Sequence, residues 1–170
     1  MPTVKKSIEA DVPVRVAYDQ WTQFEEFPRF MDGVEAVEQL DDKKLHWRAK
    51  VAGKAEEWDA EITEQVPDKI IAWRSNSGAR NEGVVRFVPL NENKTKIELE
   101  MHWEPQGVTE RIGDIIGADD ARIQGDLGRF KKFIEEQRAP TGAWRGEIHG
   151  GKVERDRAEK DLEAGTGSRG

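Results

Sequence analysis

The 170-residue chain contains no cysteine. Disulfide bonds, thiolate metal sites, iron–sulfur clusters and cysteine nucleophiles are therefore excluded. Only three histidines occur. His46 and His102 fall on the outward face of predicted strands and His149 lies near the C-terminus, so they do not have the spacing of metal ligands. We expect neither a metal nor another cofactor.

Long apolar runs are also missing. The longest, from Ile70 to Trp73, has four residues, whereas a membrane-spanning helix needs about 20. The first residues, MPTVKKSIEAD, contain two lysines but no apolar stretch after them, as a secretory signal would have. We expect a cytoplasmic protein without a membrane span.

An excess of positive charge is absent as well. The chain has 27 basic and 34 acidic residues and a net charge of −7, which argues against binding to nucleic acids or to an anionic lipid surface. Small molecules and other proteins remain as partners. The pattern leaves the oligomeric state open.

What is present is the pattern of an α+β domain. Residues 3–12 mostly alternate apolar and polar side chains, which is typical of a strand with one buried face. Pro13 can open a short helix, because the first helical turn does not use the N–H that proline lacks. A second short helical piece is expected over residues 24–31. Residues 34–103 then predict six antiparallel strands, with turn residues at intervals of roughly ten to fifteen positions.

A long helix is expected over about residues 109–137, where apolar residues recur at steps of three and four. Gly117, followed by Asp119, predicts a break or kink. Since the predicted sheet has one apolar face, this helix should cover it. The result is a curved antiparallel sheet of about seven strands wrapped around a C-terminal helix, with two short helices after the first strand.

The composition changes after residue 138. Residues 139–170 include only four large apolar side chains, too few to form a core: Trp144, Ile148, Val153 and Leu162. We therefore expect a domain over residues 1–138 and a mobile, charged, glycine-rich tail over residues 139–170. The alternative is a docking segment that uses Trp144.

The order and spacing of several motifs resemble a known superfamily. The motifs are the proline-opened helix at Pro13, Phe27-Pro28 with Phe30, Glu57-Trp58 with Ala60 and Ile62, Trp73 with Ser75 and Gly78, and Asp126-Leu127 with Arg129-Phe130. Over about residues 3–137 the chain resembles the polyketide cyclase/dehydrase and coenzyme Q-binding branch of the START-like (SRPBCC, Bet v 1-like) superfamily. This resemblance implies a helix-grip fold, with a cavity for apolar ligands between the sheet and the last helix.

The inward positions of the strands and of the long helix supply the candidate ligand-binding residues. Aromatic side chains make up much of this set, which is typical of small-molecule pockets that have few polar groups. The candidates are Trp47, Trp58, Trp73, Ser75, Phe87, Met101, Trp103, Ile116, Ile123 and Phe130. Asn81 is a further polar candidate. The cavity entrance is expected at Phe27, Phe30 and Gly117, with Phe24 near the same rim.

Three functions remain open at this point. The first is binding or carriage of a hydrophobic small molecule such as a lipid, a quinone or a polyketide-like compound. The second is a metal-independent cyclase or dehydratase, which needs an ionisable group inside the cavity; Glu56 and Tyr18 are the candidates. The third is protein interaction through the outer sheet face or the tail. The pattern favours binding over catalysis.

Overall fold

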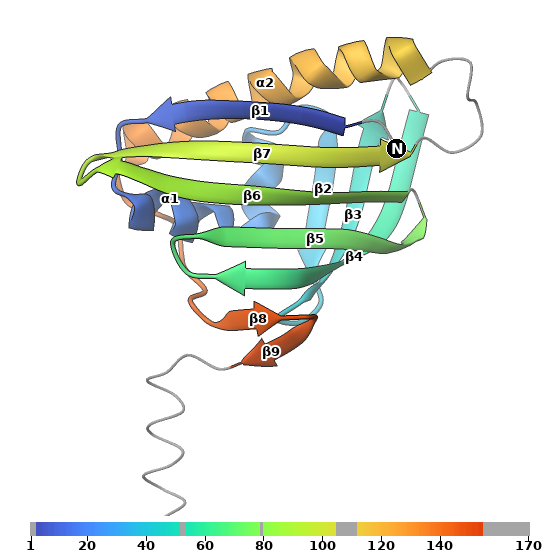
Figure 1. Cartoon of the computed structure of the whole chain (residues 1–170). Helices are drawn as coiled ribbons and strands as arrows, with labels where there is room; N and C mark the ends of the chain where they lie inside the picture. The colour runs from blue at the N-terminus through green and yellow to red at the C-terminus, as the bar shows by residue number, and fades with distance from the viewer. Residues whose placement is uncertain (1–2, 52–53, 79, 105–111, 155–170) are drawn as a thin grey trace, which may run out of the picture.

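The structure of the protein is a computed structural model that describes residues 3–51, 54–78, 80–104 and 112–154 (Figure 1). Within these ranges, the side chains of residues 51, 103–104, 112–120 and 154 are not described. The elements follow in the order β1 (Thr3–Ala10), α1 (Val14–Trp21), η1 (Phe24–Arg29), β2 (Val34–Gln39), β3 (Lys44–Val51), β4 (Lys54–Val66), β5 (Ile70–Gly78), β6 (Arg80–Asn91), β7 (Lys94–Glu104), α2 (Ile112–Gln137), β8 (Glu147–His149) and β9 (Lys152–Glu154).

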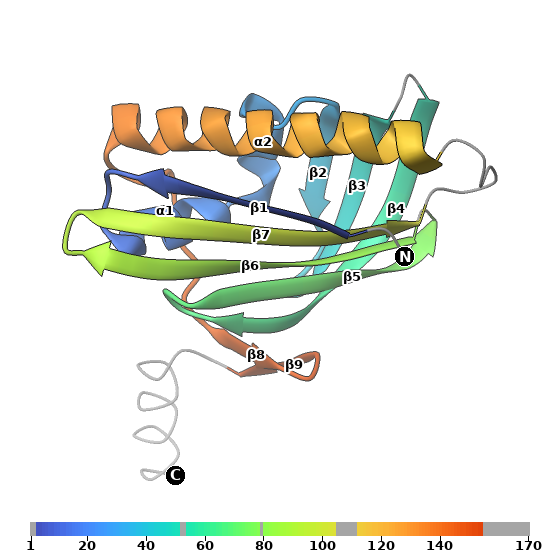
Figure 2. The ribbon, with the colours of Figure 1, turned by 45° about the horizontal axis from the view of Figure 1, so that its top comes forward.

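Seven strands form a continuous antiparallel sheet in the order β1-β7-β6-β5-β4-β3-β2. Each of the strands β2 to β6 pairs with the next along the chain, since few residues separate them, and β1 completes the order by pairing with β7. The predicted α+β fold, with a curved antiparallel sheet and a C-terminal helix, is confirmed. Figure 2 shows α2 running along β1 with the curved sheet beside it.

The apolar side of the sheet packs against the three helices. Ile71, Val85 and Ile97, from three adjacent strands, are fully buried. The residues of α2 that meet this core recur at helical spacing and form one stripe: Ile123, Leu127, Phe130 and Ile134.

Aromatic contacts join the two short helices to α2. The Trp21 ring of α1 lies 5.5 Å from Phe27 of η1 and 5.0 Å from Phe130 of α2, measured between ring centroids. Phe30, just after η1, lies 5.0 Å from the Phe130 ring. The rings of the Trp21 pairs meet edge-on, and this geometry stabilises aromatic pairs beyond what the burial of their area contributes. Both predicted short helices are present, the second as a 3₁₀ helix that contains Pro28.

Of the predicted break or kink at Gly117, the break is wrong, because α2 is one helix from Ile112 to Gln137; the kink stays a prediction. A single glycine costs a helix only about 1 kcal/mol relative to alanine, so the surrounding turns can carry it. The predicted helix start near Thr109 lies outside the described residues. No described helix is both long and apolar enough to cross a membrane.

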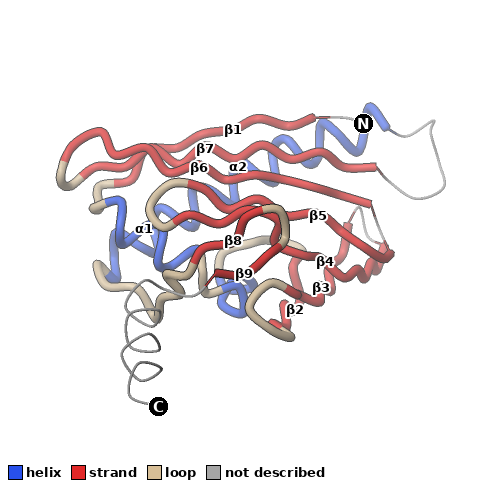
Figure 3. The backbone as a smooth tube through the Cα atoms, turned by 60° about the horizontal axis from the view of Figure 1, so that its bottom comes forward, coloured by secondary structure: helices blue, strands red, loops and turns tan. Residues whose placement is uncertain are grey.

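The structure also differs from the predicted mobile tail over residues 139–154. Ile148 of β8 is fully buried and pairs with Gln65 of β4, so the short β8–β9 hairpin extends the sheet (Figure 3). The amide of Thr141 donates a hydrogen bond to Gln20 Oε1 at 2.9 Å. We call residues 139–154 the C-terminal strap; residues 155–170 lie outside the described ranges.

One arginine anchors the C-terminal strap to the domain. Arg145 contacts Asp19 of α1 at 2.5 Å and Asp68, in the turn between β4 and β5, at 2.7 Å. Its guanidinium also lies 5.5 Å from the Tyr18 ring. The count of large apolar residues did not predict that this segment packs on the domain. One buried isoleucine and a set of polar contacts hold it there.

Candidate ligand-binding cavity

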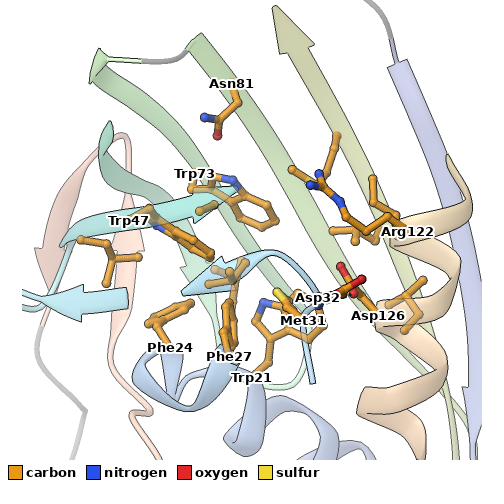
Figure 4. A pocket seen from close by; sticks show the side chains of 18 of the residues that line it. Trp21, Phe24, Phe27, Met31, Asp32, Trp47, Trp73, Asn81, Arg122 and Asp126 are labelled. Atoms are coloured by element: carbon orange, nitrogen blue, oxygen red, sulfur yellow. Dashed lines mark hydrogen bonds between the residues drawn. The ribbon is translucent and has the colours of Figure 1, made fainter. Parts of the chain in front are cut away.

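A cavity of about 90 Å³ lies between the inner face of the sheet, η1 and α2 (Figure 4). Most of its described lining is apolar, and the polar side chains gather on the α2 side, apart from Asn81. The lining consists of Trp21, Phe24, Phe27, Met31, Asp32, Val34, Leu45, Trp47, Ala49, Trp58, Ile62, Ile71, Trp73, Asn81, Leu99, Met101, Arg122, Ile123, Asp126 and Leu127.

Strand pairing places two of the tryptophans together. Trp47 of β3 and Trp58 of β4 are direct partners in the register, and their rings stack at 5.7 Å with an interplanar angle of 8°. Side chains on directly opposed residues of antiparallel strands share a face, so both indoles point to the apolar side of the sheet. Trp58 is 8% exposed, and Trp47 is partly buried against it.

The aromatic rings of α1 and η1 form the adjoining wall. Phe27 lies 5.4 Å from Phe24, 5.5 Å from Trp21 and 5.6 Å from Trp47, measured between ring centroids. Phe27 therefore connects the short helices with the stacked tryptophans of the sheet, and Figure 4 shows these rings along one side of the cavity.

Asp32, Arg122 and Asp126 give the cavity a charged edge where the loop after η1 meets α2. Asp126 accepts a hydrogen bond from the Asp32 amide at 2.8 Å and a second from Arg129. Arg129 Nε donates to the Phe30 carbonyl at 2.8 Å. These bonds tie residues 30–32 to α2. Burial raises the pKa of Asp126, although the hydrogen bonds with Asp32 and Arg129 oppose the shift.

The structure brings part of the predicted set to this cavity. Six of the predicted residues line it: Trp47, Trp58, Trp73, Met101, Ile123 and Phe27. Asn81, the further polar candidate, and Phe24 line it as well. The side chains of Trp103 and Ile116 and the surroundings of Gly117 lie outside the described part of the structure, so the place of these residues relative to the cavity stays a prediction.

Four other predicted residues are absent from the described lining. Phe87 and Phe130 are buried in the core, where each ring contacts Trp21, and Phe30 packs on Phe130. Ser75 instead accepts a hydrogen bond from the Asn81 amide at 2.9 Å. Strand parity identifies the inward face, but it does not separate side chains that fill the core from side chains that border a cavity.

The two candidate catalytic residues also do not line the cavity. Glu56 lies 3.9 Å from Lys54. Tyr18 is fully buried, and its hydroxyl accepts a hydrogen bond from Gln65 Nε2 at 2.9 Å. Burial raises the pKa of Tyr18 well above its usual value. This phenol therefore stays protonated at neutral pH and serves the packing of the core.

Sequence reasoning did not identify the charged edge or Trp21 as parts of the cavity. Trp21 could have been found, because Val14, Ala17, Tyr18 and Trp21 recur at helical spacing and form the inner stripe of α1. Asp32 and Asp126 are 94 positions apart, and no local pattern connects them. Among the described residues, no group of three or more histidine, aspartate or glutamate side chains could hold a metal ion.

The comparison with protein families gives a match over residues 10–132, to the family described as polyketide cyclase / dehydrase and lipid transport. A protein of Streptomyces lincolnensis, described as an uncharacterised 17.2 kDa protein, is 51% identical over 149 residues. That alignment covers 87% of this chain and 99% of the relative.

Solved structures share the fold. A Deinococcus radiodurans protein is 25% identical, with a TM-score of 0.65, over 81% of this chain and 99% of its own. An aromatase/cyclase of Streptomyces sp. R1128 is 15% identical, with a TM-score of 0.70, over 84% and 99%. A START superfamily protein of Mycobacterium smegmatis is 13% identical, with a TM-score of 0.65, over 77% and 98%. At 15% and 13% identity, these last two comparisons establish the architecture and not the activity.

Proposed function

Because the chain belongs to the polyketide cyclase / dehydrase and lipid transport family, we propose that it binds an apolar small molecule in the cavity between the sheet, η1 and α2. The observation that carries the proposal is the lining itself. Aromatic and aliphatic side chains surround the space, and charged groups occupy one edge. This combination is typical of small-molecule sites, where a few polar groups orient an apolar ligand.

The size of the cavity limits what it holds. Its volume of about 90 Å³ is below the roughly 300–1,000 Å³ of sites for drug-sized ligands. An apolar cavity of about 150 Å³ is known to bind benzene. A single ring or a short branched chain is therefore the largest group expected to enter with little movement of the lining. A longer lipid, quinone or polyketide would insert one end only.

A second candidate function is catalysis on a bound chain, as a cyclase or dehydratase. The observation in its favour is Asp126, a carboxyl group with a raised pKa at the edge of the cavity. A carboxyl group of this kind can exchange a proton with a bound ligand. One solved relative in fold is an aromatase/cyclase. Since Asp126 also holds Asp32 and Arg129, the structural role alone accounts for its position.

Two experiments separate these candidates. Native mass spectrometry of the purified protein with a panel of single-ring ketones, quinones, fatty acids and short polyketides should reveal one-to-one complexes for small cyclic compounds. Chromatography of the same mixtures should return these compounds unchanged if the protein only binds them.

A product that forms with the wild type and not with Asp126→Asn would favour catalysis, because asparagine keeps an oxygen acceptor for the Asp32 amide. If no compound in the panel binds, the binding proposal fails.

A further inference from the structure

The C-terminal strap binds the last turn of α1 and the residue after it through buried polar side chains. Gln20 makes two hydrogen bonds with Thr141: its Oε1 accepts from the Thr141 amide at 2.9 Å, and its Nε2 donates to the Thr141 hydroxyl at 3.0 Å. The Trp144 amide donates to the Thr22 hydroxyl at 3.1 Å. Gln20 and Thr22 are 0% and 2% exposed. Buried polar side chains require partners, and the strap supplies them here.

Arg145 joins the same end of α1 to the sheet. Its guanidinium donates to Asp19 at 2.5 Å and to Asp68, in the turn between β4 and β5, at 2.7 Å. Three residues further along the strap, Ile148 is fully buried and pairs with Gln65 of β4. The C-terminal strap therefore bridges α1 and the sheet.

The residues that the strap holds flank a side chain of the cavity wall. Trp21 lies between Gln20 and Thr22 in the sequence and lines the cavity, as do Phe24 and Phe27 just after it. The Phe27 ring lies 5.5 Å from Trp21 and 5.4 Å from Phe24, so the three rings form one wall. No described residue of the strap lines the cavity itself. The strap therefore acts on the cavity through the position of α1.

We propose that the C-terminal strap is a clamp that holds the wall of Trp21, Phe24 and Phe27 in place and thereby keeps the cavity small. Release of the strap from α1 lets this wall move outward, so that the cavity admits ligands larger than a single ring. This inference rests on the proposed binding function and adds a control over the size of the ligand. A cavity of about 90 Å³ requires a wider state before a drug-sized molecule can enter whole.

The two states differ at two separate places. With the strap bound, the hydrogen bonds to Asp19, Gln20 and Thr22 are made and the cavity is narrow. With the strap released, these bonds are broken and the cavity is wide. A ligand that fits only the wide state shifts the equilibrium toward release, and release tightens the binding of that ligand by the same factor. A ligand that fits the narrow state does not favour release.

The test compares benzene, a single ring, with biphenyl, which carries a second ring. The Kd of each compound is measured for the full-length wild type and for Arg145→Gln, at a temperature where both are folded. The variant keeps a polar side chain but removes the charge that holds Asp19 and Asp68. Lys152→Gln is the matched control, because it removes the same charge from an exposed strap residue that pairs with His149 within the β8–β9 hairpin.

We expect Arg145→Gln to lower the Kd of biphenyl about 5-fold or more relative to that of benzene, at the lower end of the usual coupling between two sites. Lys152→Gln should leave the ratio of the two Kd values unchanged. Using benzene as the reference removes any effect of the variant that is common to both ligands.

Hydrogen exchange in the wild type tests the reverse direction of the coupling. Biphenyl should speed the exchange of the Thr141 and Trp144 amides, which donate to α1, and benzene should not. The Phe87 amide, which donates to the Lys69 carbonyl within the sheet at 2.9 Å, is the reference and should not change. This measurement does not depend on how a variant folds.

The outcomes distinguish the clamp from the binding site. If both compounds bind, the Kd ratio is the same in all three proteins and biphenyl does not speed exchange at Thr141 and Trp144, the clamp inference is wrong and the binding proposal stands. The same conclusion follows if benzene binds but biphenyl binds none of the three proteins. If neither compound binds the wild type or Arg145→Gln up to its solubility, the binding proposal fails and the inference fails with it.

Discussion

The indole of Trp73 lies directly against Gly83, its partner on the neighbouring strand β6. A β-carbon at position 83 would lie 2.5 Å from Cζ2 and 2.8 Å from Cε2 of Trp73. It would also lie 3.1 Å from the Glu100 carbonyl oxygen on β7. The missing side chain at Gly83 therefore gives the Trp73 ring the space to lie across the sheet at the cavity.

Gly83→Ala should disturb the cavity more than the fold, because the added methyl group must displace the Trp73 ring. We expect a loss of stability of about 1–3 kcal/mol, as for other overpacked sites, and a weaker affinity for any ligand that contacts Trp73. Urea unfolding and a ligand titration at a temperature where both proteins are folded measure the two effects.

Gly128→Ala is the control, since a β-carbon there meets nothing within 4 Å in α2. It should raise stability by about 0.5–1 kcal/mol through helix propensity and leave the affinity unchanged. An unaltered affinity in Gly83→Ala would show that the position of the Trp73 ring does not matter for binding.

Removal of the C-terminal strap should destabilise the domain. A chain that ends at Arg138 loses the buried Ile148 and the contacts of Arg145 with Asp19 and Asp68. It also removes the 2.5 Å contact of Arg145 from the buried carboxylate of Asp19, which keeps its longer contact with Arg15 at 3.6 Å. Removing a partner from a buried ion pair costs several kcal/mol in comparable cases. We expect a loss of at least about 3 kcal/mol, measured by urea unfolding.

A chain that ends at Glu154 is the matched comparison, because it keeps every described residue of the strap. The difference between the two truncated chains isolates residues 139–154. Equal unfolding free energies for the two chains would contradict the anchoring role of Arg145 and Ile148.

On the outer face of the sheet, the pair of His46 and Asp59 should make the free energy of unfolding depend on pH. Its hydrogen bond with Asp59 at 2.7 Å, and a longer one with Glu57, raise the pKa of His46 above its ordinary value of 6.5. The same bond, together with one from Ser77, lowers the pKa of Asp59 below 3.8.

The signs of the two shifts define the pH window. A histidine with a raised pKa stabilises the fold fully below 6.5 and loses this effect as the pH rises through its folded pKa. A carboxylate with a lowered pKa stabilises the fold above 3.8 and loses this effect as the pH falls through its folded pKa. The pair therefore contributes fully between 3.8 and 6.5.

Urea unfolding of the wild type and His46→Ala should differ by up to about 1 kcal/mol at pH 5.5, the usual range for a surface pair. The difference should be much smaller at pH 9. Asp59→Asn should remove most of this pH dependence. A difference that is the same at both pH values would mean that the pair contributes nothing to stability.

Strand periodicity predicted the sheet and the side of it that faces α2. Trp47, Trp58 and Trp73 lie at the cavity because side chains alternate across a strand, and this rule needs no tertiary information. The same rule also selected Phe87, which fills the core beside Tyr18. Whether an inward ring meets another ring or an open space depends on the path of α1 and η1, and strand parity does not describe that path.

Composition was a poor guide where a few contacts decide the structure. Residues 139–154 have little apolar surface, yet Ile148 is fully buried and Arg145 joins two carboxylates. The charged edge was missed for a similar reason. Asp126 is one of several acidic residues on α2, and only its contact with the Asp32 amide distinguishes it.

Titration of tryptophan fluorescence with tetramethyl-1,4-benzoquinone, a single-ring quinone, tests the central claim most directly. The account predicts saturable quenching with one-to-one stoichiometry. It also predicts that Trp73→Ala weakens binding by about 1–3 kcal/mol beyond its effect on folding, roughly the value of one large buried side chain. His46→Ala, on the outer face, should bind as the wild type does. Quenching that rises linearly without saturation, or that is equal in the wild type and Trp73→Ala, would contradict a binding site in this cavity.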